Sequence, residues 1–143
     1  LLRCLGKQIA NQLNLKVNLD DYWDDEIGSK LSCSLMVHQI LKNSNNPIVL
    51  VLNEVDRIFE QSALAQDFFS LLRSWYEEAR QDPDWQKLRL VVVYSTEEYI
   101  NLDINQSPFN VGLPLHLGEL TSQQVTELAL RHDQNWKTSQ TEQ

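Results

Sequence analysis

The sequence predicts an α/β fold in which a parallel sheet lies between layers of helices. Two short apolar runs, at residues 48–52 and 88–94, carry this prediction. Turn-forming residues precede the first run and polar residues follow both, as expected of strands that are buried on both faces. One amphipathic segment separates the runs, which indicates a β-α-β unit with a right-handed crossover.

Two helices are predicted before the first strand. Apolar residues recur at helical spacing over residues 1–13, and a second helix is expected over residues 29–42. The acidic stretch between them lacks the alternating spacing of a calcium loop, so a solvated loop anchored by Tyr22 and Trp23 is expected. The residues expected on the packing side of the second helix are Leu31, Leu35, Ile40 and Leu41.

Two helices and a third strand are also predicted after the first strand. A long amphipathic helix is predicted over residues 59–80, and Pro83 ends it. A third short strand is predicted at residues 113–117, where Pro114 indicates a sheet edge or a strand start. Thr121 then begins a capped helix.

Composition excludes some classes of protein. The chain has 143 residues, with 12 basic and 20 acidic side chains and a net charge of −8, which argues against a nucleic-acid binder. No run approaches the length of a membrane span and no signal peptide is evident, so a cytoplasmic protein is expected. Cys4 and Cys33 lack the spacing of a metal site and are expected to be buried free thiols.

The chain is expected to form one domain over residues 1–132, followed by a polar, disordered tail at residues 133–143. It starts with Leu1 rather than Met, and Leu1 belongs to the first predicted helix. We therefore expect the natural protein to begin further upstream.

Polar side chains gather where the two predicted strands end. They belong to Asn53, Glu54, Asp56, Arg57, Ser95 and Thr96. Because the carboxyl ends of parallel strands meet at one edge of a sheet, Glu54 is expected to lie near Ser95 or Thr96. In open α/β sheets this edge is where ligands bind.

The first strand and its tip resemble the second nucleotide motif of P-loop ATPases, an apolar run followed by Asp-Glu. In that motif the Asp helps to hold magnesium and the Glu activates or orients the attacking water. Here Asn53 stands at the Asp position and Glu54 is retained. An amide can accept a hydrogen bond from a metal-bound water, but it lacks the negative charge that a magnesium site uses. A buried strand that ends in a solvated acidic turn is the alternative interpretation.

Five segments together resemble the bacterial AAA-like domain family of P-loop ATPases, which is common in cyanobacteria. The resemblance covers roughly residues 1–132. The segments are Tyr-Trp-Asp-Asp at 22–25, Leu-Val-Leu-Asn-Glu-Val-Asp-Arg at 50–57, Ala-Gln-Asp-Phe-Phe at 65–69, Leu-Leu-Arg-Ser-Trp at 71–75 and Ser-Pro-Phe-Asn-Val-Gly at 107–112.

The resemblance implies a three-layer P-loop NTPase-like fold with ATP and magnesium as cofactors. It implies that Glu54 is the catalytic acid that orients water, and that Asn53 contacts magnesium through a water molecule. It also implies that Ser95 or Thr96 senses the γ-phosphate, and that the loop at residues 108–110 shapes the wall near the nucleotide. Asp56 and Arg57 are further candidates for nucleotide contacts.

One departure from the family pattern concerns the phosphate loop. No G-x-x-x-x-G-K-[ST] occurs in the 143 residues. The resemblance implies that this loop and its strand lie upstream, and that the strand sits between those at residues 88–94 and 113–117. We therefore expect an incomplete sheet with two unpaired edges, to be closed by the missing N-terminal part of the domain or by another chain.

These observations leave three functional hypotheses. In the first, the chain is the C-terminal part of an ATPase domain of a signalling protein, with ATP as a switch or slow substrate, and is inactive by itself. In the second, the domain is degenerate and serves as a nucleotide-free interaction module with protein partners or a second copy. In the third, it is an unrelated flavodoxin-like domain that binds a small anion at the strand tips.

Overall fold

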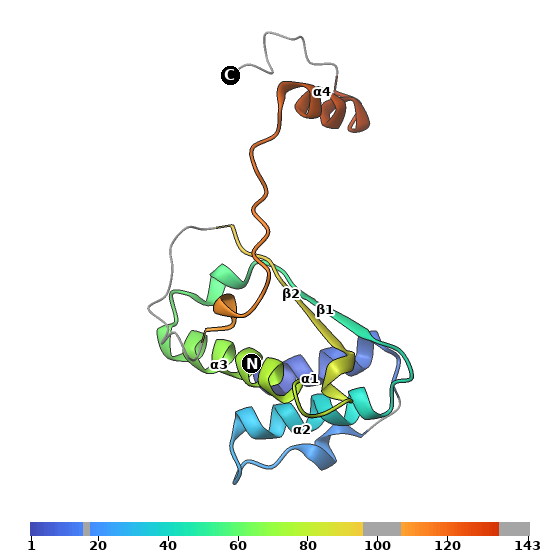
Figure 1. Cartoon of the computed structure of the whole chain (residues 1–143), viewed down its shortest axis with the longest axis vertical. Coiled ribbons are helices and arrows are strands. Elements are labelled where there is room, and N and C mark those ends of the chain that lie inside the picture. Colours follow the sequence, from blue (N-terminus) through green and yellow to red (C-terminus); the bar gives the residue numbers. More distant parts are fainter. Residues whose placement is uncertain (16–17, 96–106, 135–143) are drawn as a thin grey trace. The chain divides into compact units, whose positions relative to one another are not determined.

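The computed structural model describes residues 1–15, 18–95 and 107–134. The chain divides into two units, Leu1–Gly112 and Leu113–Gln143. The first unit contains both strands and the helices α1, α2 and α3, and the second contains α4 (Figure 1). Each unit is described by itself.

The first unit is an α/β structure with a parallel sheet, as predicted. β1 (Ile48–Leu52) pairs with β2 (Leu88–Val92), so that Ile48 lies opposite Leu88 and Leu52 opposite Val92. Figure 1 shows the two strands side by side. Among the described residues the sheet has two strands, and the predicted three-layer arrangement is not seen there.

The prediction that both faces of the strands are buried is wrong. One face packs on the helical core through Ile48, Leu50, Leu52, Leu88, Leu90 and Val92. On the other face Val49 is 61% exposed, Val51 57% and Val91 43%. The described helices of this unit cover one face of the sheet only, and a short apolar run does not reveal whether a second layer is present.

Helices α1 (Leu2–Gln12) and α2 (Ser29–Lys42) confirm the two helices predicted before the sheet. They pack closely because Gly6 of α1 has no side chain where it meets Met36. A Cβ atom at Gly6 would lie 3.0 Å from the Met36 Cε atom. Ile9 and Ala10 complete the buried side of α1.

The packing side predicted for α2 is correct for two of its four residues and wrong for the other two. Ile40 and Leu41 are buried, but Leu31 is 53% exposed and Leu35 41%. The buried side also includes Ser32, Cys33, Met36 and Val37. The Ser32 hydroxyl donates to the Asp24 carbonyl at 2.6 Å and accepts from the Asp24 amide, which turns this polar position inward to anchor the preceding loop.

The two thiols differ, contrary to the expectation that both are buried. Cys33 is buried and its Sγ atom lies 3.4 Å from the Leu2 carbonyl oxygen. Cys4 is exposed, because the buried residues of α1 are Leu2, Gly6, Ile9 and Ala10, and Cys4 lies off that side of the helix.

The acidic stretch contains a short 3-10 helix, η1 (Leu19–Tyr22). Asp20 accepts from Arg3 at 2.7 Å and from Lys7 at 2.9 Å, which ties this stretch to α1. Tyr22 and Trp23 pack against the core, as the predicted anchoring requires.

The long helix predicted after β1 is present as α3 (Ser62–Glu78). Its Trp75 is fully buried, donates from Nε1 to the Ser34 hydroxyl at 2.9 Å and stacks on Trp85. Trp85 begins the 3-10 helix η3 (Trp85–Lys87), which leads directly into β2.

In the second unit, α4 (Ser122–Arg131) confirms the capped helix. Thr121 accepts from the Gln124 amide, and the Gln124 side chain accepts from the Thr121 amide, which completes a capping box. The described residues of the predicted tail end at Gln134.

The strand predicted at residues 113–117 is wrong. Its leucines stand 80–95% exposed, and no described strand pairs with the segment. A strand depends on hydrogen bonds to a neighbour, and Pro114 has no amide hydrogen to offer one.

Across residues 1–15, 18–95 and 107–134, no helix combines the length and the apolar character needed to cross a lipid bilayer.

Candidate functional site

The carboxyl ends of β1 and β2 are joined by an irregular step. The Val93 amide donates to the Leu52 carbonyl at 2.8 Å, which continues the parallel ladder. In a regular ladder the Val93 carbonyl would then accept from residue 54, but it accepts from the Val55 amide at 3.2 Å. One extra residue is therefore inserted in the β1 strand, as in a β-bulge, and this lifts Asn53 and Glu54 out of the ladder.

Glu54 sits at this bulge in a left-handed backbone conformation, with φ 56° and ψ 42°. This region is sterically costly for a residue with a Cβ atom. The Glu54 carboxylate is 53% exposed and forms an ion pair with the Arg57 guanidinium, at 2.7 Å from Nε to Oε2. Arg57 is itself 77% exposed, so the pair restrains Glu54 only loosely.

Asp56 and Ser95 bring the two strand tips together. The Ser95 hydroxyl donates to Asp56 Oδ2 at 3.3 Å. The other carboxylate oxygen, Asp56 Oδ1, is buried and has no hydrogen-bond partner among the described residues. Asp56 lies in the 3-10 helix η2 (Val55–Ile58), which starts directly after the bulge.

An aromatic cluster borders the tip of β2. Phe109, from the 3-10 helix η4 (Pro108–Asn110), lies 5.2 Å from the Tyr94 ring and 5.1 Å from the Phe69 ring, measured between centroids. Tyr94 directly precedes Ser95, so the loop at residues 108–110 packs beside this strand tip.

The structure thus joins the two strand tips through Ser95 and Asp56, whereas the topology predicted that Ser95 or Thr96 lies near Glu54. Asn53 is exposed at the bulge. Among the residues that the structure describes, Ser95 makes its hydrogen bond to Asp56 rather than to Glu54. Thr96 lies outside the described residues.

These groups offer an exposed carboxylate, an amide and a hydroxyl at one sheet edge. A carboxylate such as Glu54 can accept a proton from water or orient it. The amide oxygen of Asn53 can accept a hydrogen bond from a metal-bound water. Asp56 Oδ1 is buried and lacks a hydrogen-bond partner among the described residues. Within the 143 residues no Gly-rich phosphate loop accompanies them.

Two features of this site have no clear signal in the sequence. A bulge with a left-handed residue is usually marked by Gly or Asn, and Asn53 stands one position before the residue that takes this conformation. The contact of Phe109 with Tyr94 joins residues from different segments, and only their shared aromatic character could have suggested it.

Comparison with known proteins identifies a family for this chain. The profile of the family described as AAA-like domain matches residues 1–143, the whole chain. No curated protein and no solved structure matches the sequence significantly. The chain therefore belongs to the AAA-like domain family.

Proposed function

We propose that this domain binds ATP with magnesium at the strand tips and uses the nucleotide as a switch or slow substrate in a signalling protein. The observation that carries the proposal is the bulge at Asn53 and Glu54, which holds an exposed carboxylate at the end of β1 in a strained conformation. Strained backbone of this kind is concentrated at functional sites. The family match supports the same assignment.

In this proposal Glu54 orients the water that attacks the γ-phosphate. Ser95, fixed to Asp56 by its hydroxyl, senses the γ-phosphate from the neighbouring strand. Asn53 contacts magnesium through a bound water, and Arg57 and Asp56 provide further polar contacts at the edge. Magnesium would neutralise charge on the phosphates. Thr96 is the second candidate for the sensing role.

The 143 residues contain no Gly-rich loop that ends in Lys-Ser/Thr. The groups that bind the β- and γ-phosphates therefore have to come from residues outside this sequence. We propose that upstream residues of the same domain supply them and cover the valine face of the sheet, formed by Val49, Val51, Val91 and Val93. Its valines alternate along both strands with the residues that pack on the core, and Arg89, opposite Val49, is the charged residue on the same face. By itself, the chain is expected to hydrolyse no ATP.

The test is ATP hydrolysis by the full-length protein and its Glu54→Gln variant. The variant should still bind Mg-ATP but lose hydrolysis by at least a hundredfold, because an amide cannot act as a base toward water. Glu60→Gln is the matched control, since Glu60 is an exposed glutamate just past η2, and should hydrolyse ATP like the wild type. Equal hydrolysis by wild type and Glu54→Gln would contradict the role of Glu54.

A second candidate function is an interaction module that does not use nucleotide. Asn53 favours it, because the position lacks the negative charge that a magnesium site uses. A full-length protein that binds no Mg-ATP at millimolar concentration would select this function.

A further inference from the structure

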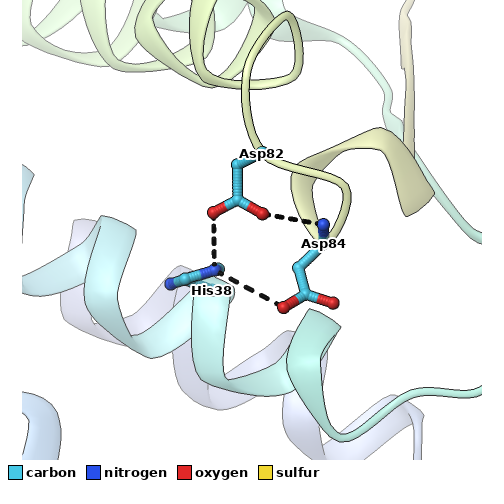
Figure 2. A group of neighbouring side chains, drawn as sticks. All are labelled: His38, Asp82 and Asp84. Carbon is cyan, nitrogen blue, oxygen red and sulfur yellow. Dashed lines mark hydrogen bonds and ion pairs between the residues drawn. The ribbon is translucent and has the colours of Figure 1, made fainter.

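A second polar cluster lies at the amino-terminal end of β2, the opposite end of that strand from Ser95. It consists of His38 from α2 and of Asp82 and Asp84 from the turn between α3 and η3. Figure 2 shows both carboxylates directed toward the imidazole. His38 Nε2 lies 3.0 Å from Asp82 Oδ2 and 3.9 Å from Asp84 Oδ2, and the three donor atoms all lie within 4.8 Å of one another.

Each carboxylate is held in place by its other oxygen. Asp82 Oδ1 accepts from the Asp84 backbone amide at 2.8 Å (Figure 2). Asp84 Oδ1 accepts from Lys87 Nζ at 2.7 Å, and the same ammonium group donates to the Leu41 carbonyl. Two oxygens, one from each aspartate, are therefore left facing the histidine. Outer contacts of this kind orient the ligands of metal sites.

The imidazole is also oriented by its surroundings. It stacks on Trp85, with 5.7 Å between ring centroids and 6° between the planes, and Trp85 in turn stacks on Trp75. His38 Nε2 is shielded from solvent and makes no hydrogen bond within the described residues. Its approach to Asp82 is an ion-pair contact without hydrogen-bond geometry. A buried polar atom in this state needs a partner.

We propose that His38, Asp82 and Asp84 bind a divalent transition-metal ion of the zinc type. Bonds of 2.0–2.2 Å to a tetrahedral zinc place the donor atoms about 3.3–3.5 Å apart, and the observed 3.0 and 3.9 Å bracket this spacing. The two carboxylate oxygens lie within 4.8 Å of each other, so both aspartates would have to move slightly closer to complete the coordination. Three protein ligands leave a fourth position for water.

The ligand set also selects the type of metal. Imidazole nitrogen suits zinc, copper and nickel, whereas calcium and magnesium prefer oxygen ligands alone. Lys87 touches Asp84, and Lys42 acts on the Asp84 carboxylate through space. These positive charges weaken metal binding without blocking it, because Lys87 occupies the oxygen that faces away from His38.

The competing explanation is a simple ion pair that ties α2 to the turn before η3. Isothermal titration calorimetry with ZnCl₂ distinguishes the two, using the protein after treatment with EDTA. The proposal predicts one zinc per chain, and at least tenfold weaker binding by His38→Gln and by Asp82→Asn. Calcium and magnesium should not displace the zinc.

Two variants serve as controls for binding elsewhere. His132→Gln and Cys4→Ser remove an exposed histidine and an exposed thiol, and both should bind zinc like the wild type. Circular dichroism confirms that each variant folds. No zinc binding by the wild type, or unchanged binding by a folded His38→Gln variant, would overturn the proposal.

Tryptophan fluorescence provides a second test that does not depend on the heat of zinc binding. Cu²⁺ bound at His38 would lie beside the stacked Trp85 and Trp75 and quench their fluorescence. The quenching should saturate at one equivalent and should be lost in His38→Gln. Zinc should also raise the unfolding temperature of the wild type and not that of the variant, because the site joins two segments only in the folded state.

Discussion

Glu54 is the residue on which the proposed chemistry depends, and its backbone explains why it projects from the sheet. The bulge shifts the hydrogen bond of the Val93 carbonyl from residue 54 to Val55. The side chain of Glu54 is then free of the ladder, at the cost of a left-handed conformation. In a regular strand the backbone amide of Glu54 would donate to the Val93 carbonyl.

This strain is open to measurement with two substitutions that both remove the carboxylate. Gly tolerates a left-handed conformation and Ala does not, so Glu54→Gly should be more stable than Glu54→Ala by about 1 kcal/mol. Urea unfolding followed by circular dichroism gives the difference. A Glu54→Ala variant as stable as Glu54→Gly would show that the strain is absent in solution.

The two cysteines should react at very different rates. Burial raises the pKa of the Cys33 thiol to about 12, so almost none of it is the reactive thiolate at pH 8, whereas Cys4 is exposed. Ellman's reagent should label one thiol quickly in the native protein and two after denaturation. In Cys4→Ser the fast reaction should disappear, and fast labelling that persists would mean that Cys33 is accessible.

At the scale of elements, the contact between α1 and α2 depends on Gly6. A branched side chain there would press on Met36, which lies 3.0 Å from the position of a Cβ atom. Gly6→Val should lower the free energy of unfolding by about 1–3 kcal/mol. Gly118→Val is the control, because a Cβ atom at Gly118 meets nothing within 4 Å. Equal stability of the two variants would show that α1 does not pack on α2 this closely.

The link between α1 and η1 should make stability depend on pH. Hydrogen bonds from Lys7 and then Arg3 hold the pKa of Asp20 below its ordinary value of 3.8. A lowered folded pKa stabilises the protein above the ordinary value, and this stabilisation is lost as the pH falls through the folded pKa. The stability advantage of wild type over Asp20→Asn should therefore be present at pH 7 and shrink below about pH 4. Urea unfolding at each pH measures this difference. A difference in urea midpoint that stays constant between pH 7 and pH 4 and below would contradict the ion-pair link.

Prediction from the sequence succeeded for elements that carry their own signals. The helix over residues 29–42 and the strand at residues 48–52 were found with the correct bounds, because turn residues and hydrophobic spacing mark their ends. Prediction failed where the structure of a segment depends on which other segments it contacts. The predicted strand around Leu115 has no partner strand among the described residues. Ser32 and Met36, rather than Leu35, lie on the buried side of α2.

The candidate site was predictable in part for the same reason. Parallel strands bring their carboxyl ends to one edge, so Ser95 could be expected near the Asn53–Arg57 stretch. The bulge at Glu54 and the cluster of His38 with Asp82 and Asp84 depend on backbone geometry and on contacts between distant segments. Neither has a fixed spacing in the sequence.

At the scale of the whole molecule, the described sheet has one face on the helical core and one face of exposed valines. A two-stranded sheet of this kind is weakly stable by itself, since each strand keeps an unpaired edge. The proposed nucleotide site and the proposed cover for the valine face require the same thing, further residues of the AAA-like domain.

The most direct measurement is thermal unfolding with and without Mg-ATP, for this chain and for the full-length protein that contains it. We expect the full-length protein to unfold at a higher temperature when Mg-ATP is added, since a ligand of the folded state stabilises it. For this chain alone we expect no shift. An unchanged unfolding temperature of the full-length protein with Mg-ATP, or a shift for the short chain, would contradict the proposed nucleotide site.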